Sequence, residues 1–122
     1  MDKAKNNEDI VIHGDGKQTR SMGYVYDIVD GLVLMMDNFD YCKGDIFNIG
    51  TDEEISVLDH AEIIKEEVGS SSKIIFISEE MAHGNYQDIR KRKPDLSKSK
   101  KILNFKPTYK FRDIIKKINL IK

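Results

Sequence analysis

The chain has 122 residues, enough for one domain with a modest hydrophobic core. Hydrophobic residues make up 39% and charged residues 34%, a balance typical of a well-solvated small domain or of a piece of a larger one. The net charge of -1 excludes a global field that would draw the chain to nucleic acid or to a membrane, so any anion site must be local. Cys42 is the only cysteine, which excludes an internal disulfide and a cysteine-based metal site and fits a reduced, cytoplasmic setting.

The first third of the chain predicts a short strand, a tight turn and a long helix. Residues 1–9 are polar, lack the apolar core of a signal peptide and are typical of the end of a helix and its loop. The β-rich run 10–13 ends at Gly14-Asp15-Gly16, a strong turn signal. Residues 21–25 indicate a second short extended piece. Apolar residues at helical spacing then predict an amphipathic helix over 26–38.

The middle of the chain predicts a loop, a strand and a capped helix. The loop covers 39–44, and the strand covers 45–50 and closes on a glycine. Ser56 is a candidate N-cap for a helix over 57–68, because Asp59 follows three residues later as in a capping box.

The last third predicts one more strand and two helices around a long loop. The strand covers 73–77, and residues 79–93 have no steady period. Loops of that length inside compact domains tend to be functional or disordered. Helices are expected over 96–103 and 111–121, which makes the fold class α/β.

Two basic motifs, one near each end of the chain, are the candidate functional features. The first is the run 14–20, in which glycines and Arg20 could approach a phosphate; the alternative is a hairpin-like turn with solvated charges. It is neither a Walker loop nor a dinucleotide fingerprint, because both spacings are absent. The second is the run 90–95, with four cations before Pro94. It could be a phosphate clamp, a nuclear-import-like patch or a nucleic-acid contact, or else a solvated loop.

No residues assemble into a catalytic centre. The three histidines have no metal-ligand spacing, and His60 is predicted to lie on the surface of its helix. The run 90–93 has no aromatic residues between its basic ones, and the chain has no net positive charge, so nucleic-acid binding is not expected. The longest apolar stretch, 32–36, is far too short to cross a bilayer, so no membrane association is expected.

Six runs of the chain form a recognisable series in their order: 11–21, 24–32, 47–50, 55–59, 86–100 and 102–107. This series resembles the extended short-chain dehydrogenase/reductase family, and in particular its NAD-dependent nucleotide-sugar epimerases, dehydratases and decarboxylases. In the last run, Asn104 stands where the family's usual ending, leucine–glycine–aromatic–x-proline, has its glycine.

This resemblance implies a role for four residues in holding a nucleotide-sugar. Arg20 matches the arginine that contacts the nucleotide diphosphate, and Asn48 matches a strand-end position near the nucleotide. Arg92 matches the later arginine that closes on the phosphates, and in the decarboxylase branch a matching arginine has an accessory part in the chemistry. Gln18 lies beside the nucleotide by neighbourhood only. Two guanidiniums on separate segments can neutralise a diphosphate and orient the sugar.

The departures from the family are as informative as the matches. The glycine-rich NAD motif and the catalytic Tyr-x-x-x-Lys with its Ser/Thr partner are absent. The resemblance therefore implies a C-terminal substrate-binding portion over 10–122, with a truncated lead-in over 1–9, that lacks the N-terminal Rossmann core. NAD would be bound by that missing domain, in cis or in trans, and the chain alone is expected to hold neither a cofactor nor a metal.

Three hypotheses from different classes remain open at this point. The first is the substrate-binding part of a nucleotide-sugar enzyme, closest to UDP-glucuronate decarboxylases and UDP-glucose 4-epimerase-like members, with UDP as the nucleotide. It predicts an exposed apolar surface where the Rossmann half would dock, hence self-association. The second is a standalone nucleotide-sugar-binding module without catalysis. The third is an interaction protein that uses residues 90–93 on a polyanion.

Overall fold

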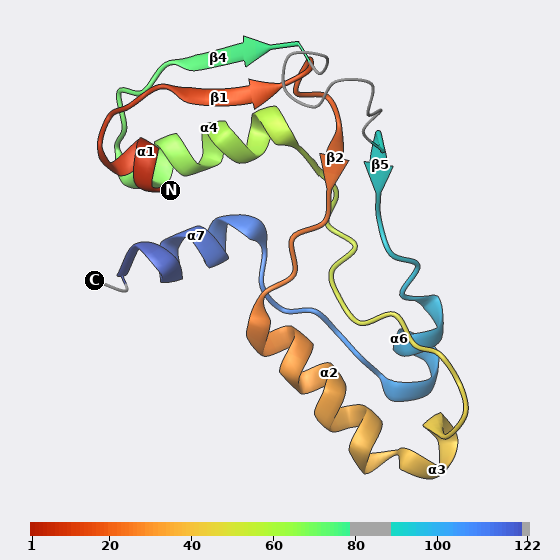
Figure 1. Ribbon diagram of the computed structural model, residues 1–122. Helices are drawn as coiled ribbons and strands as arrows, with labels where there is room; N and C mark the ends of the chain where they lie inside the picture. The colour runs from red at the N-terminus through yellow and green to blue at the C-terminus, as the bar shows by residue number, and fades with distance from the viewer. Residues whose placement is uncertain (79–88, 121–122) are drawn as a thin grey trace.

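The computed structural model describes residues 1–78 and 89–120, which form two lobes joined by short strands (Figure 1). The fold class is α/β, as predicted. The sheet lobe contains α1 (Asp2–Lys5), β1 (Ile10–His13), α4 (Val57–Val68), β4 (Ile74–Ile77) and α7 (Phe111–Leu120). The helical lobe contains α2 (Val25–Asp37), α3 (Phe39–Cys42) and α6 (Ser97–Leu103). The connecting strands are β2 (Thr19–Arg20), β3 (Ile55–Ser56) and β5 (Lys91–Arg92).

The sheet lobe is built in layers. β1 pairs with β4 in parallel, with register partners running from Ile10 and Ile74 to His13 and Ile77. Helix α4 lies along one face of this pair, and α7 lies on the other side of α4 (Figure 1). Parallel strands need a crossover connection, and α4 belongs to the segment that provides it. The core of the lobe consists of buried apolar side chains, among them Ile12, Ala61, Phe111, Ile114 and Ile115.

Helix α4 has the bounds and the caps that the sequence predicts. The Ser56 hydroxyl accepts a hydrogen bond from the Asp59 backbone N–H at 3.0 Å and donates to the Asp59 carboxylate at 2.6 Å. Gly69 ends the helix in the left-handed conformation, with φ 65°. These local signals satisfy backbone groups that would otherwise lack a partner at the helix ends, so they set where the helix begins and ends.

The predicted surface position of His60 is wrong. Only 6% of the residue is exposed, and its ring meets the ring of Phe111 edge to face at a centroid distance of 4.2 Å. The reason is the packing of α7 on α4, which covers a position that the sequence places in an ordinary helix. Burial lowers the pKa of His60 from 6.5, opposed by the nearby Asp59 and Glu53 carboxylates and the Ser56 carbonyl.

The helical lobe has a small core of its own. Cys42, Leu96, Leu103 and Phe105 are buried there, and partly buried side chains pack around them, namely Leu34, Met35, Phe47 and Ile49. The predicted strand over 45–50 is wrong: this segment has no sheet partner among the described residues and instead lays alternate side chains on the core. Residues 39–42, predicted as loop, form the single turn of α3.

Two further boundaries differ from the sequence analysis. The extended piece expected over 21–25 lies earlier, at Thr19–Arg20, and α2 already begins at Val25. The expected long loop contains β5 at Lys91–Arg92, while its part over 79–88 lies outside the described residues. Both strands are only two residues long, too short for a periodic pattern to reveal them.

One face of α2 is apolar and exposed. Its side chains follow each other at helical spacing with exposed fractions between 46% and 74%: Val25, Val29, Leu32, Val33 and Met36. The opposite face of α2 packs on the core of the helical lobe. Within the described ranges, no helix is both long and apolar enough to cross a membrane.

Candidate functional site

The turn after β1 is a rigid loop built from glycines and one aspartate. Gly14 and Gly16 have φ values of 73° and 71°, a backbone conformation that glycine adopts without strain. The Asp15 carboxylate accepts the Lys17 N–H at 2.9 Å and closes the turn. Gly16 is buried, and an added Cβ would lie 3.2 Å from the Cβ of Leu58. The turn therefore sends the chain from β1 into β2 along a fixed path.

Strand pairing brings the two predicted arginines together. β2 pairs with β5 in parallel, and Arg20 is the register partner of Arg92. Register partners on adjacent strands project from the same face of a sheet, so both side chains leave on one side. Arg20 Nη1 donates to the carbonyls of Thr19 at 2.7 Å and Ile89 at 2.9 Å, while Arg92 is exposed. Two arginine side chains on the same face of a sheet can bind one anion together.

Asn48 comes from the segment between α3 and β3 and lies against the start of α6. Its side-chain N–H donates to the Asp95 carbonyl at 3.0 Å, and its own carbonyl accepts from the Ser99 hydroxyl. Ser99 is fully buried, so this contact anchors Asn48 on the helical lobe. The side chain of Asn48 remains exposed. The structure thus attaches Asn48 to the segment that directly follows Arg92.

An open hollow of about 350 Å³ lies at the segment between β5 and α6. It is lined by Asp52, Lys93, Pro94, Asp95, Leu96, Ser97 and Lys100. Asp52 and Lys100 form an ion pair there at 2.5 Å, and Lys100 is the main cause that lowers the pKa of Asp52. The hollow offers room for part of a ligand beside Lys93, the residue that directly follows β5.

Gln18 is buried, whereas Asn48 and Arg92 are exposed and Arg20 is half-buried. Only 5% of it is exposed, and its side-chain N–H donates to the His13 carbonyl at 2.8 Å. Its buried Oε1 has no hydrogen-bond partner within the described chain. In this structure Gln18 joins the end of β1 to β2, and its role beside a ligand stays a prediction.

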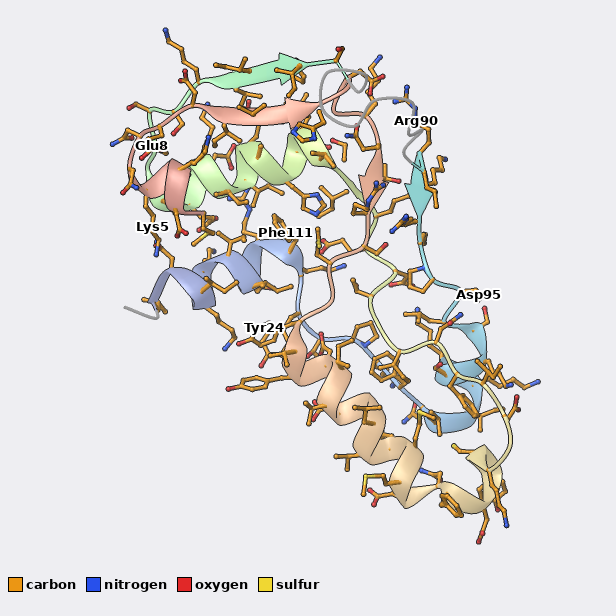
Figure 2. The ribbon with its side chains drawn as sticks, viewed as in Figure 1. Lys5, Glu8, Tyr24, Arg90, Asp95 and Phe111 are labelled. Carbon is orange, nitrogen blue, oxygen red and sulfur yellow. The ribbon has the colours of Figure 1, made fainter. Side chains whose placement is uncertain are left out.

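Sequence reasoning missed the part that Arg90 plays. Arg90 Nη1 lies 2.7 Å from the Asp15 carboxylate, and the Arg90 carbonyl accepts the Thr19 N–H at 2.8 Å. The pKa of Asp15 is lowered, first by the Lys17 N–H and then by Arg90. Figure 2 shows Arg90 where the chain enters β5 and Asp95 beyond the end of β5, where the chain reaches α6. Arg90 is the first residue of the basic run, so the sequence did mark it as a candidate. The sequence does not indicate which acidic residue forms an ion pair with it.

The residues described here do not fit a dinucleotide. A Rossmann site needs glycines that lead from a strand into a helix N-terminus, where the pyrophosphate binds. Here the glycines after β1 lead into β2, and the buried Gly16 packs against Leu58 and Phe76. No group of three His, Cys, Asp or Glu residues within ranges 1–78 and 89–120 could hold a metal ion.

Most of this chain matches known proteins. The family model described as GDP-mannose 4,6 dehydratase matches residues 1–118. The chain is 41% identical over 104 residues to UDP-glucuronic acid decarboxylase 1 of Arabidopsis thaliana, covering 85% of this chain and 22% of that protein. It is 39% identical over 106 residues to UDP-N-acetyl-alpha-D-glucosaminuronate decarboxylase of Bacillus cytotoxicus, covering 85% and 32%.

A solved structure shares the fold as well. UDP-glucuronic acid 4-epimerase from Bacillus cereus, in complex with UDP-glucuronic acid and NAD, matches with a TM-score of 0.80 and 26% identity over 93% of this chain and 34% of that one. The chain belongs to the extended short-chain dehydrogenase/reductase family of nucleotide-sugar epimerases and dehydratases. It spans only 22% to 32% of the length of the two curated relatives named above.

Proposed function

We propose that this chain is the substrate-binding part of an NAD-dependent nucleotide-sugar epimerase, dehydratase or decarboxylase, and that it holds the diphosphate of a UDP-sugar between Arg20 and Arg92. The observation that carries the proposal is the register pairing of these two arginines on β2 and β5. It is supported by the relatives, whose names contain UDP-glucuronic acid and a UDP-amino sugar acid.

The physical argument rests on charge and shape. A diphosphate presents oxygens to both sides, and a guanidinium can form charge-assisted hydrogen bonds to phosphate oxygens. Such charge-assisted bonds contribute about 1.5–3 kcal/mol each. Asn48 and the hollow beside Lys93 both lie at the segment that follows β5 and would receive the part of the nucleotide beyond the phosphates. In this arrangement the chain binds and orients the nucleotide and leaves the sugar to other groups.

The chemistry of the sugar would need a second part of the enzyme. NAD, bound by a Rossmann half, would take up and return the hydride, and the residues of this chain would present the substrate to it. The exposed apolar face of α2 supports such a partner, since a contiguous apolar surface of this kind marks an interface. Whether that half is in cis or in trans, we propose that it docks on this face of α2, and that an unpartnered chain self-associates there.

The test is calorimetric titration of UDP into the 122-residue chain. We expect a dissociation constant roughly in the micromolar range, raised at least about tenfold in Arg20→Ala and in Arg92→Ala. Lys106→Ala removes the same charge from an exposed position outside the site and serves as the control. If neither arginine variant changes the dissociation constant for UDP, the proposal is wrong. Turnover of UDP-glucuronate by this chain with NAD is not expected, since no described residues form a dinucleotide site.

A further inference from the structure

We infer that Arg90 and Asp15 are positioning residues, whose ion pair holds β5 against β2 so that Arg92 lies in register with Arg20. For its functional consequence the inference rests on the proposed binding of a diphosphate. The contact joins the two basic motifs directly, at 2.7 Å between Arg90 Nη1 and Asp15 Oδ1.

β5 has little else to hold it in place. It is two residues long, its only ladder in the described chain is with β2, and both Lys91 and Arg92 are exposed. Short strands without an apolar face are weakly stable in water. The entry to β5 is therefore fixed by polar contacts: the Arg90–Asp15 pair, the Thr19 N–H on the Arg90 carbonyl and Arg20 on the Ile89 carbonyl.

Asp15 is a suitable fixed point for this purpose. Its carboxylate is already oriented by the Lys17 N–H, within a turn whose two glycines adopt left-handed backbone angles. The turn follows β1, whose ladder with β4 anchors it to the sheet lobe. A side chain that is oriented before the contact forms loses less entropy when Arg90 binds it.

Register matters here because Arg92 lies two residues after Arg90. A slip of one residue in β5 would turn the Arg92 side chain to the opposite face, away from Arg20. The ion pair at the entry to the strand opposes that slip. Arg90 thus acts on the anion through the position of Arg92 and does not need to touch the ligand.

The experiment is a double-mutant cycle with Asp15→Asn and Arg90→Gln. Asparagine keeps the oxygen that closes the turn and removes only the charge. We expect each single variant to weaken UDP binding by roughly two- to fivefold, the range for an exposed pair, and the double variant to be no weaker than either single one. Amide exchange of Thr19, whose N–H bonds to the Arg90 carbonyl, should accelerate in parallel.

Arg112→Gln is the matched control, because it breaks another exposed arginine pair, with Glu66 and Glu67 in the sheet lobe. It should change neither UDP affinity nor Thr19 exchange. Additive losses in the cycle, or weaker binding with unchanged Thr19 exchange, overturn the positioning role. If the unaltered chain does not bind UDP, the proposed function fails, and the exchange of Thr19 in the same variants still decides whether the ion pair holds β5.

Discussion

Arg20 and Arg92, near opposite ends of the chain, are register partners in a parallel pair of two-residue strands. The pairing places two cations on one face of a sheet that contains β3, β2 and β5. Like charges at adjacent positions of a sheet repel each other, and we propose that a bound anion offsets this repulsion. It turns two separate sequence motifs into one candidate site.

Replacing Arg92 by lysine should weaken UDP binding less than replacing it by alanine. Lysine keeps the positive charge but loses the planar fork that matches phosphate oxygens. We expect Arg92→Ala to cost about 1.5–3 kcal/mol and Arg92→Lys roughly half of that. Calorimetry at low and at high salt checks this, because the charge-dependent part of the loss shrinks with screening. Equal affinities for the lysine and alanine variants would mean that Arg92 contributes no charge to binding.

Asp27→Asn should destabilise the fold by roughly 1–3 kcal/mol without altering UDP affinity. Asp27 is 1% exposed and accepts three hydrogen bonds: from the Thr108 N–H at 3.0 Å, the Thr108 hydroxyl at 2.8 Å and the Tyr109 N–H at 3.2 Å. These contacts join α2 to the segment before α7, and an amide presents an N–H where these donors need an acceptor.

Urea unfolding of Asp27→Asn measures the loss, and Asp30→Asn, an exposed acid on the same helix, is the control. We expect the control to change the free energy of unfolding by less than about 0.5 kcal/mol. Equal midpoints for the two variants would contradict the structural role of Asp27.

The elements that the sequence predicts well are those set by local chemistry. Helix α4 has the expected bounds because Ser56 and Gly69 cap it from within the same segment. The strand predicted over 45–50 fails for the opposite reason: Phe47 and Ile49 alternate as in a strand, but a strand needs a partner from elsewhere in the chain. The period of the apolar residues indicates which side chains are buried. It does not indicate whether the backbone forms hydrogen bonds with another strand.

The sequence predicted which residues form the candidate site, but it did not predict how the fold arranges them. The resemblance selected Arg20 and Arg92, but their register depends on a ladder between strands too short to leave a pattern. The sequence also could not predict that Arg90 pairs with Asp15, because the chain contains 21 acidic residues and its composition does not distinguish among them. Long-range pairing of this kind is a property of the folded backbone.

Gly31→Ala should destabilise the helical lobe, although alanine is the better helix former. An added Cβ would lie 2.4 Å from Ile49 Cγ2 and 3.1 Å from Phe105 Cε2, inside contact distance. The gain of about 1 kcal/mol in helix propensity is then outweighed by overpacking of about 1–3 kcal/mol, because Phe105 is 1% exposed and has no room to move. Thermal unfolding should show a lower midpoint than for the unaltered chain.

The matched variant for this test is Asp30→Ala, at the exposed position just before Gly31 in α2. It changes helix propensity without filling the space beside Ile49, so it should leave the midpoint unchanged or raise it. If Gly31→Ala also raises the midpoint, the close approach of α2 to Ile49 and Phe105 is not present in solution.

The stability of the protein should fall as the pH drops through the ordinary pKa of histidine, because of His60. Burial lowers the pKa of His60 below 6.5 in the folded chain, so the unfolded chain takes up the proton at a higher pH than the folded chain does. Above pH 6.5 the neutral His60 contributes its full stabilisation. As the pH falls below 6.5 this stabilisation decreases, and it stops decreasing once the pH is below the pKa of His60 in the folded chain. Urea unfolding at about pH 7.5 and about pH 5.5 measures this difference. His60→Leu, which keeps an apolar side chain against Phe111, should reduce it, whereas an equal pH dependence in both proteins would show that His60 does not cause it.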